Sequence, residues 1–410
     1  MIFQESLIFF YTGVFFTLFV GIFYLLTFFE NRSRFRDPKA RKIPFVSIIV
    51  PAYNEEKTLA KTVNSLLRMD YPKEKLEIIV VDDGSKDRTF EIAKSFSGRG
   101  VRAFKKENGG KGSAINLGLK KVRGEFVAVL DADSFVGKDA LKSMVGYFEK
   151  KRVMAVTPTL KVYKPRGFWQ KVQYIEYLFS VFFRKIFSFM QGVYVTPGPL
   201  SVYRKSFFLK HGGFDEKNIT EDLEIALRIQ SKNYEIQNSI NAHVYTVAPN
   251  TFRGLMNQRV RWFTGLTDNL YNYRGLFSRN YGSLGVFVLP IAVISILLVL
   301  SHLAYYGVLG AINAFNSLYN IYLVNFDLGV IISEYFAGLS LFNLISPLLV
   351  LFIILIASST FILHLAKKYS GDKEDVRFNF VMYLLTYGVI FSLWWVTTLA
   401  HKIFNWRVKW

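Results

Sequence analysis

The sequence predicts an α/β domain with a Rossmann-like, mostly parallel sheet, combined with an α-helical region that crosses a membrane several times. Three observations predict this combination. Long apolar segments lie towards both ends of the 410-residue chain, a polar and basic body lies between them, and short apolar strands alternate with helical segments in that body. Continuous apolar strands separated by helices are typical of parallel sheets that are covered on both faces.

The N-terminal segment predicts a transmembrane helix over residues 1–30. Residues 7–29 carry no charge, and at about 1.5 Å per residue they form a helix long enough to cross a bilayer. A signal peptide fits less well, because the segment is long and lacks both a basic start and a small-residue cleavage site. Six basic residues follow between Arg32 and Lys42. Because basic flanks stay in the cytoplasm, we expect the N-terminus outside and the next domain inside.

The C-terminal segment, residues 285–400, predicts a transmembrane bundle. No Lys or Arg occurs between Arg279 and Lys367. Three segments in this region are long and apolar enough to span a bilayer, namely residues 285–308, 345–366 and 378–400.

The number of C-terminal crossings stays open between three and four. Residues 328–343 are short and carry Glu334, so this segment is a short crossing, a re-entrant segment or an extracellular helix. The basic tail, residues 401–410, favours a cytoplasmic C-terminus and therefore four crossings. The basic loop 367–377 argues the other way.

The body between these segments predicts one cytosolic domain over residues 43–250, followed by amphipathic interface helices over residues 251–284. At its start, strands are expected at 46–50, 76–81, near Val101 and at 126–130, and helices at 55–69, 88–96 and 112–122. Ligands of such sheets bind at the carboxyl ends of the strands. We therefore expect polar residues at three strand ends to converge on one site.

Two of these strand ends carry carboxylates, and the pair Asp131 and Asp133, one residue apart at one strand end, suits a divalent cation. Asp83 lies in an Asp-Asp-Gly-Ser turn, and Asp131-Ala-Asp133 follows a buried strand. A turn or loop is the simpler reading of each. A calcium loop is excluded, because Phe135 and Lys142 stand where oxygen ligands are required. Oxygen ligands favour Mg²⁺ or Mn²⁺, which can bridge a diphosphate.

A glycine-rich turn precedes the third predicted helix. Asn108-Gly-Gly-Lys-Gly-Ser113 lacks the spacing of a nucleotide-binding P-loop. A glycine-rich turn that leads into a helix can nevertheless bind an anion, with Lys111 as a point charge. Taken alone, this is a weak signal.

Two later segments have ordinary structural interpretations as well. Thr220-Glu-Asp222 precedes an apolar helix, where Thr is a common N-cap and acids are common in the first turn. The segment Gln258-Arg-Val-Arg-Trp262 places Gln258, Arg261 and Trp262 on one helix face, which could simply anchor the helix at a membrane surface.

The motifs become specific when they are taken together. They occur in the order Val46-Ser-Ile-Ile-Val-Pro-Ala-Tyr-Asn-Glu55, Val81-Asp-Asp-Gly-Ser85, Asp131-Ala-Asp133, Thr220-Glu-Asp222 and Gln258-Arg-Val-Arg-Trp262. This series resembles that of membrane-embedded processive family 2 glycosyltransferases, the group of cellulose, chitin, hyaluronan and poly-N-acetylglucosamine synthases. The resemblance covers residues 46–262. It implies a GT-A fold, a nucleotide-diphosphate sugar donor that is usually UDP-linked, and inversion at the anomeric carbon.

The resemblance also implies roles for single residues. Asp222 matches the catalytic base, and its place in the first turn of a helix predicts a lowered pKa. Asp133, assisted by Asp131, is expected to hold Mn²⁺ or Mg²⁺. Asp83 matches the nucleobase contact, Lys111 and Arg261 are expected near the diphosphate, and Trp262 is expected to stack on the acceptor sugar. The substrate-binding set is Pro51, Tyr53, Glu55, Asp83, Lys111, Asp131, Glu221, Gln258, Arg261 and Trp262.

Some family signatures are missing. No Phe-x-Val-Thr-x-Lys stretch occurs, which disfavours cellulose, and no Trp-Gly-Thr-Arg stretch occurs. Gly198-Pro-Leu200 resembles an acceptor-side segment of hyaluronan and chitooligosaccharide synthases and weakly favours hexosamine-type polymers. The predicted function is therefore a metal-dependent, inverting, processive transfer to the non-reducing end of a growing polysaccharide, which is then translocated across the plasma membrane.

Two alternatives remain. A polyprenyl-phosphate glycosyltransferase would share the catalytic domain and add one sugar to a lipid phosphate. A non-enzymatic membrane transporter or anionic-ligand binder would explain the net charge of +20 without chemistry. Because the basic residues lie in membrane flanks and the cytosolic body, we expect a lipid bilayer and nucleotide sugar as partners rather than nucleic acid. The composition excludes a disordered chain, and the absence of Cys excludes thiolate metal sites and cysteine nucleophiles.

Overall fold

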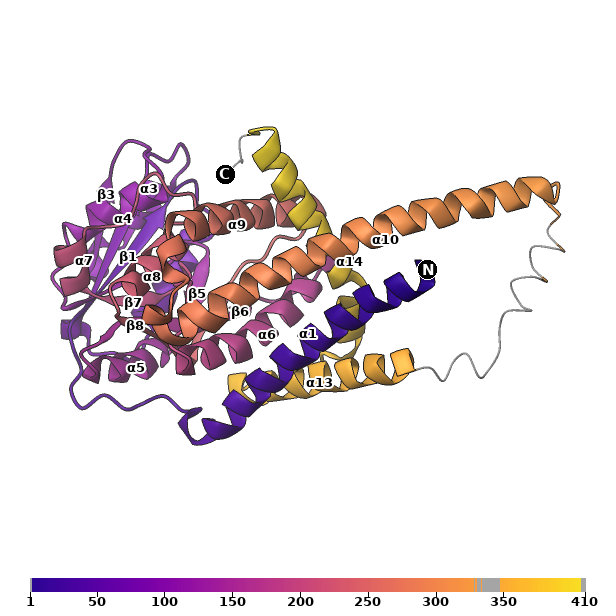
Figure 1. The fold of residues 1–410 in the computed structure, drawn as a ribbon. Helices are drawn as coiled ribbons and strands as arrows, with labels where there is room; N and C mark the ends of the chain where they lie inside the picture. The colour runs from indigo at the N-terminus through magenta and orange to yellow at the C-terminus, as the bar shows by residue number, and fades with distance from the viewer. Residues whose placement is uncertain (1, 328, 330–332, 334–346, 407–410) are drawn as a thin grey trace. The chain divides into compact units, whose positions relative to one another are not determined.

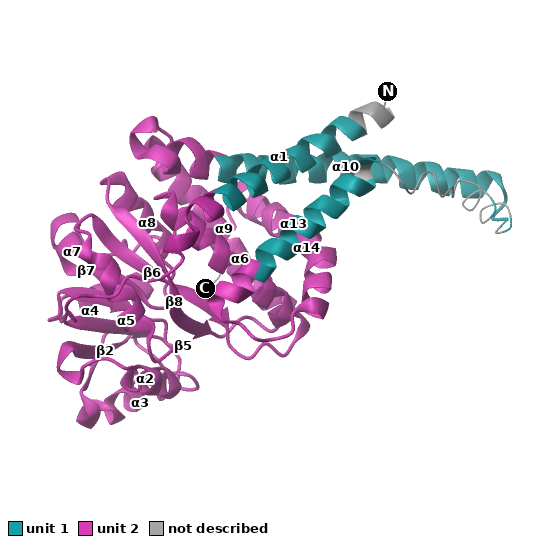
Figure 2. Ribbon diagram, turned by 90° about the horizontal axis from the view of Figure 1, so that it is seen from below, with its two compact units in different colours: residues 1–26, 291–364 teal, residues 27–290, 365–410 magenta. Residues whose placement is uncertain are grey.

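The computed structural model describes residues 2–327, 329, 333 and 347–406. The chain forms two compact units (Figure 2). Unit 1 comprises Met1–Leu26 and Ile291–His364, and unit 2 comprises Thr27–Pro290 and Leu365–Trp410. Unit 2 contains the sheet and all the motifs identified in the sequence.

In the described part of unit 2, eight strands form one sheet in the order β3-β2-β1-β4-β7-β6-β8-β5. The strands are β1 (Val46–Ala52), β2 (Leu76–Asp82), β3 (Val101–Lys105), β4 (Phe126–Val129), β5 (Ser134–Val136), β6 (Val153–Val162), β7 (Ser201–Arg204) and β8 (Glu235–Thr246). The first four strands pair in parallel, as the alternation of strands and helices predicts. Beyond β4 the sheet is mixed, because β7 is antiparallel to both β4 and β6.

Helices cover both faces of the parallel half (Figure 1). On one face lie α2 (Leu59–Leu67), α3 (Thr89–Ser95) and α5 (Ala140–Val145), and on the other lie α4 (Lys111–Leu119), α7 (Lys205–His211) and α8 (Glu221–Ser231). Strand β1 shows why both faces are apolar, because Ile48 packs into one core and Ile49 into the other. Both side chains are fully buried.

The predicted strands and helices of this half are confirmed, with shifted boundaries. The helix predicted over residues 55–69 begins only at Leu59. The chain first turns across the end of β1, where Asn54 takes a left-handed conformation with φ of 55°. This turn leaves Tyr53 and Glu55 at the carboxyl end of the strand.

Three longer helices complete unit 2. They are α6 (Phe168–Phe189), α9 (Phe252–Asn272) and α14 (Arg377–Ile403). Helix α6 packs on β6 and β8, α9 packs on α8, and α14 packs on both α6 and α9. The packing of α9 on α8 brings the Gln258–Trp262 motif to the same side of the domain as Thr220-Glu-Asp222.

Unit 1 consists of helices. They are α1 (Ile2–Glu30), α10 (Leu289–Leu323) and α13 (Pro347–Ser370), which enter unit 2 at one end each. Within unit 1, His302 Nε2 of α10 lies 2.8 Å from the carbonyl oxygen of Phe9, and the missing side chain of Gly13 makes room for its ring.

Among the described residues, four helices are long and apolar enough to cross a membrane, over Leu7–Glu30, Leu284–Leu323, Leu349–Ser370 and Arg377–Ile403. The helices predicted at the two ends of the chain are therefore confirmed as helices, and α10 is longer than the predicted segment 285–308. The segment 328–343 lies almost wholly outside the described residues.

Candidate active site

A cavity of about 470 Å³ opens at the carboxyl ends of β1, β2 and β4. Eight of the residues predicted to bind substrate or metal line it, namely Pro51, Tyr53, Glu55, Asp83, Lys111, Asp131, Asp133 and Arg261. These residues come from segments that are far apart in the sequence, and the parallel register of the three strands brings them together. A cavity of this size suits a drug-sized or nucleotide-sized ligand.

Lys111 binds to two carboxylates of this site. Its Nζ lies 2.7 Å from Asp131 Oδ1 and 3.0 Å from Glu221 Oε1. Burial by itself would lower the pKa of Lys111, but the charges of Asp131, Glu221 and Asp222 raise it above its ordinary value. Lys111 is therefore a permanent cation, and it links α4, the end of β4 and the start of α8.

Asp222 lies in the same charge cluster, but its pKa differs from the prediction. Burial, followed by the charge of Glu221, raises the pKa of Asp222 to about 6, while Lys111 and Arg261 act in the opposite direction. The predicted lowering of this pKa is wrong. A place in the first helix turn contributes about 0.3–1 kcal/mol, which is smaller than the cost of desolvating a buried carboxylate.

The loop before β7 fastens Asp222 to the Asp131–Lys111 pair. Thr196 donates its backbone N–H (3.1 Å) and its hydroxyl (2.7 Å) to the carbonyl oxygen of Asp222. A Cβ at Gly198 would come within 2.6 Å of both Asp131 carboxylate oxygens and of Lys111 Nζ. Any larger residue there would have to displace the Asp131–Lys111 pair, and this is the glycine of the Gly198-Pro-Leu200 segment.

The motif that contains Thr220 is held by α9 rather than by its own cap. Thr220 precedes α8, but its side chain makes no capping bond to the helix. Its hydroxyl donates to Asn218 Oδ1 (3.3 Å) and accepts from Asn269 Nδ2 (3.0 Å). Asn269 is fully buried, and Gly265 lets the helix approach Thr220 closely. Sequence reasoning missed both residues, and the one available signal was a glycine inside a helix.

Asp83 organises the glycine-rich turn. Its carboxylate accepts hydrogen bonds from the backbone N–H of Gly109 (3.1 Å) and Gly110 (2.8 Å) and from Lys106 Nζ (2.8 Å). Gly110 has φ of 87°, which favours glycine. Two N–H groups of the predicted anion-binding turn are thus bound to Asp83, and its nucleobase role stays a prediction. Lys106 was not predicted.

Asp133 and Asp131 form the candidate metal centre. Burial, then the charges of Asp131 and Glu55, raises the pKa of Asp133 to about 7. Among the residues that the structure describes, no three Asp, Glu or His side chains are grouped to hold a metal ion. Mg²⁺ is usually held by one or two carboxylates together with substrate phosphates. The pair therefore fits a cation that binds together with a diphosphate.

On α9, a buried arginine that the sequence reasoning did not single out positions Trp262. The guanidinium of Arg259 lies 4.1 Å from the Trp262 ring centre and 5.2 Å from that of Trp394. It forms an ion pair of 2.7 Å with Glu176 of α6 and is 1% exposed. Gln258 lies next to it, and its Oε1 is buried without a hydrogen-bond partner in the described structure.

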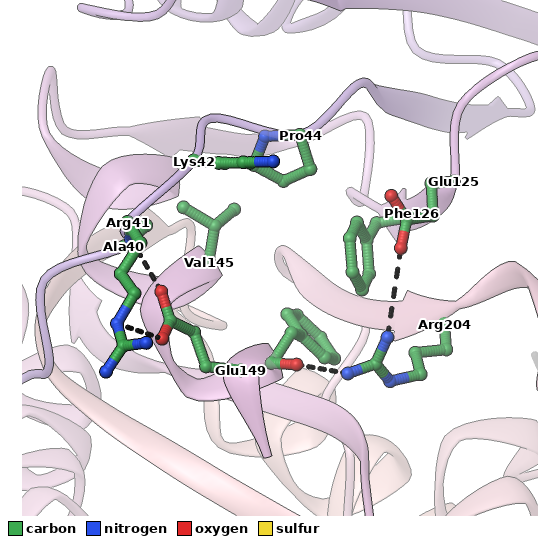
Figure 3. Close-up of a pocket in the computed structure, with 10 residues that line it drawn as sticks. Ala40, Arg41, Lys42, Pro44, Glu125, Phe126, Val145, Glu149 and Arg204 are labelled. Carbon is green, nitrogen blue, oxygen red and sulfur yellow. Dashed lines mark hydrogen bonds and ion pairs between the residues drawn. The ribbon is translucent and has the colours of Figure 1, made fainter. Parts of the chain in front are cut away.

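A second pocket, of about 340 Å³, lies at the opposite ends of the strands (Figure 3). Arg204 at the end of β7 faces Phe126 at the start of β4, and its guanidinium lies over the rings of Phe126 and Phe148. Arg204 also donates to the carbonyl oxygen of Val153 (3.0 Å) and pairs with Glu125 at 3.8 Å. The contacts of Arg204 are those of a structural residue.

Comparison with known proteins agrees with this geometry. Residues 47–212 match the family model described as glycosyl transferase family 2. The chain is 30% identical over 270 residues to a β-monoglucosyldiacylglycerol synthase of Trichormus variabilis. The aligned region covers 64% of this chain and 58% of that protein. The chain is 32% identical over 239 residues to a poly-β-1,6-N-acetyl-D-glucosamine synthase of Staphylococcus epidermidis, with coverage of 57% and 58%. The matched part thus spans little more than half the length of these curated relatives.

The fold resembles that of one solved structure over almost the whole length of the chain. The mannosyltransferase PcManGT of Pyrobaculum calidifontis, solved in complex with GDP-Man and Mn²⁺, gives a TM-score of 0.61 at 19% identity. The match covers 97% of this chain and 99% of that one. This likeness concerns the fold. Residues 47–212 thus match glycosyl transferase family 2, and the mixed sheet that contains them is GT-A-like, as the ordered motifs predict.

Proposed function

We propose that the protein transfers a sugar from a nucleotide-diphosphate sugar to an acceptor hydroxyl, with inversion at the anomeric carbon. The observation that carries this proposal is the position of Asp222, a half-buried carboxylate in one charge cluster with Glu221 and with Lys111 and Asp131, which line the cavity. A base with a pKa of about 6 is ionised at neutral pH and still accepts a proton readily.

The chemistry follows from these residues. Asp222 takes the proton of the acceptor hydroxyl while the hydroxyl oxygen forms a bond to the anomeric carbon. The bond from that carbon to the diphosphate breaks, and the diphosphate leaves with the electron pair. Lys111 and Arg261 line the cavity as cations that stabilise this charge. Asp133 and Asp131 would hold Mn²⁺ or Mg²⁺, which neutralises diphosphate charge when it is bound.

The proposed acceptor is a growing polysaccharide, which the enzyme extends processively and moves across the plasma membrane. The Gln258–Trp262 motif, with Trp262 held against Arg259, supports a sugar acceptor. A relative named as a poly-β-1,6-N-acetyl-D-glucosamine synthase supports the same class and a hexosamine donor. The four long apolar helices support a multi-pass membrane protein whose sheet domain faces the cytoplasm.

A lipid acceptor is the second candidate. It is supported by the relative named as a β-monoglucosyldiacylglycerol synthase, which matches this chain to a similar extent as the polysaccharide synthase. The reaction at the anomeric carbon would be the same, with a lipid hydroxyl or a lipid phosphate in place of the sugar hydroxyl. The family 2 domain argues against a non-enzymatic transporter or binder.

The test is nucleotide release by the full-length, detergent-solubilised protein with a panel of UDP- and GDP-sugars and Mn²⁺ or Mg²⁺. We expect turnover with one donor, strict dependence on the cation and a long polysaccharide product. A single-sugar lipid product, formed when diacylglycerol or polyprenyl phosphate is supplied, would replace the polysaccharide by the lipid acceptor. Equal turnover by the wild-type protein and Asp222→Asn would contradict the proposed chemistry.

A further inference from the structure

Helix α14 differs from the three other long apolar helices in its place in the fold. Helices α1, α10 and α13 each run from unit 2 into unit 1, whereas α14 belongs to unit 2 over its whole length (Figure 2). Length alone would allow it to cross, since its 27 residues extend about 40 Å. Whether α14 crosses the membrane therefore has to be judged from its packing.

Both ends of α14 are attached to the sheet domain. Just before it, Asp372 accepts a hydrogen bond of 2.5 Å from the hydroxyl of Tyr174 on α6, and Lys161 of β6 donates to the Ser370 carbonyl oxygen at 2.8 Å. At its far end, Lys402 pairs with Asp268 of α9, the residue next to Asn269. Both ends are therefore held by residues of unit 2.

Aromatic contacts hold the helix between these ends. Phe179 of α6 lies 5.6 Å from Tyr383, and Phe263 of α9 stacks on Trp395 at 4.5 Å between ring centres. Helix α9 carries Arg253, Arg259, Arg261 and Asp268, and α6 carries Lys171, Glu176, Arg184 and Lys185. Four charged residues in one membrane-spanning helix are rare, because each charge is costly in the hydrocarbon. Because α14 packs along both α6 and α9, it lies at the same depth relative to the membrane as these two helices.

The opposite face of α14 is a continuous apolar surface. We define the α14 stripe as Phe378, Val381, Leu385, Val389, Val396 and Ile403, which are between 43% and 71% exposed. These positions recur every three, four or seven residues, so they share one face of the helix. Within the helix, charge is confined to its ends, at Arg377 and Lys402.

We infer that α14 lies in the plane of the cytoplasmic leaflet, with its stripe in the lipid, and does not cross the membrane. This inference takes the membrane location from the proposed function. An amphipathic helix of this kind buries its apolar face about 5–10 Å below the headgroups. The partner of the stripe is thus a lipid surface.

The inference also removes a conflict in the sequence. The basic loop 367–377 and the basic tail 401–410 cannot both lie in the cytoplasm if α14 crosses, because they flank it. If α14 lies along the surface, both segments are cytoplasmic. Since the packed face of α14 contacts Arg259 through Trp394, the acceptor-side motif of α9 then lies at the leaflet surface.

The absence of Cys makes a direct test available. Single cysteines at Leu385, Val396 and Ile403 of the full-length protein are labelled with bimane. The proteins are reconstituted in phosphatidylcholine–phosphatidylglycerol vesicles and quenched with lipids spin-labelled at two depths. We expect equal depths, within about 5 Å, at all three positions. Leu297 and Val308 of α10, both exposed apolar positions, serve as matched controls and should differ by about 16 Å in depth.

A crossing helix gives a different result. Leu385 and Ile403 would then differ by about 27 Å along the membrane normal, and this gradient would overturn the inference. Unquenched emission at all three α14 positions, with normal quenching on α10, would overturn it as well; a blue shift of that emission would then favour a second copy of the chain, and water-like emission would favour an exposed stripe. Unquenched emission at α10 too would instead refute the membrane location.

A second measurement does not depend on the stripe itself. Single cysteines at Lys373 and Phe404, which are exposed on either side of α14, are treated with a membrane-impermeant maleimide in sealed inverted vesicles. We expect both positions to react to the same extent. Reaction at position 373 with protection at 404 would show that α14 crosses.

Discussion

The cavity at the carboxyl ends of the strands and the pocket at their amino ends differ in how their charges are balanced. In the cavity, several carboxylates surround Lys111. Burial and nearby carboxylates raise the pKa values of Asp133 and Asp222. In the pocket of Figure 3, Arg41 pairs with Glu149 at 3.2 Å and Arg204 with Glu125 at 3.8 Å.

This difference favours the carboxyl ends of the strands as the functional end of the sheet. Clustered carboxylates without enough cations cost stability, and such sites persist where a ligand or a reaction requires them. Balanced pairs at the other end hold the strands and their flanking loops together. Substitutions in the cavity should therefore lower activity, whereas substitutions in the pocket of Figure 3 should lower stability.

The largest effect is expected for Asp222→Asn, which removes the proposed base but keeps the shape of the side chain. Nucleotide release should fall by about 10²–10⁴-fold, the usual contribution of a general base. The matched control is Glu224→Gln in the same helix, where the carboxylate pairs with Arg228 at 2.9 Å away from the cavity lining. Comparable losses of nucleotide release in both variants would show that the activity depends on the integrity of helix α8 and not on a base at position 222.

Lys111→Met should lower nucleotide release by about 10²-fold, because a cation next to the leaving diphosphate is lost. Lys111 also lowers the pKa of Asp222, so its removal should move the acidic limb of the pH–rate profile to higher pH. Lys120→Met, at the exposed end of α4, should leave both quantities unchanged. An unshifted pH–rate profile in the Lys111 variant would show that Lys111 does not influence the pKa of the base.

Asp133→Asn should abolish metal-dependent turnover and yet stabilise the cation-free protein. The pKa of Asp133 is about 7 in the fold against an ordinary value of 3.8, so its ionisation opposes folding as the pH rises through this range. At pH 7.5 the variant should gain about 1–2 kcal/mol in unfolding free energy, and at pH 4 nothing. Thermal unfolding at both pH values measures this, and a loss of stability at pH 7.5 would contradict it.

The smallest effect on activity is expected for Arg204→Leu in the pocket of Figure 3. The loss of its ion pair and carbonyl contacts should lower stability by about 1–3 kcal/mol, with an unchanged KM for the donor. Arg204→Lys keeps the charge but loses the planar stacking on Phe126. Its stability should lie between that of the wild type and that of Arg204→Leu. A raised donor KM in either variant would assign a binding role to this pocket.

The sequence allowed the parallel half of the sheet and most of the cavity lining to be predicted, because both follow from local patterns. Apolar runs that end in Asp or Asn identify strand ends, and parallel pairing then brings those ends together. Asp83, Asp131 and Asp133 could be predicted for this reason. The antiparallel β7 could not, since its register depends on contacts between distant segments.

Other features depend on the tertiary structure alone. The support of Thr220 by Asn269 and of Trp262 by Arg259 joins helices whose packing no local pattern reveals. The pKa of Asp222 was predicted in the wrong direction because helix position is visible in the sequence, whereas burial beside Glu221 is not. For α14, the composition is that of a spanning helix, whereas its packing on α6 and α9 is visible only in the structure.

The measurement that tests the central claim most directly is the pH dependence of nucleotide release by the wild-type protein at saturating donor and cation. If Asp222 is the base, the logarithm of the rate should rise with unit slope as the pH increases towards about 6 and then level off, because the carboxylate must be ionised. In Asp222→Asn the residual rate should lack this limb. A limb that persists unchanged in the variant would show that another group accepts the proton.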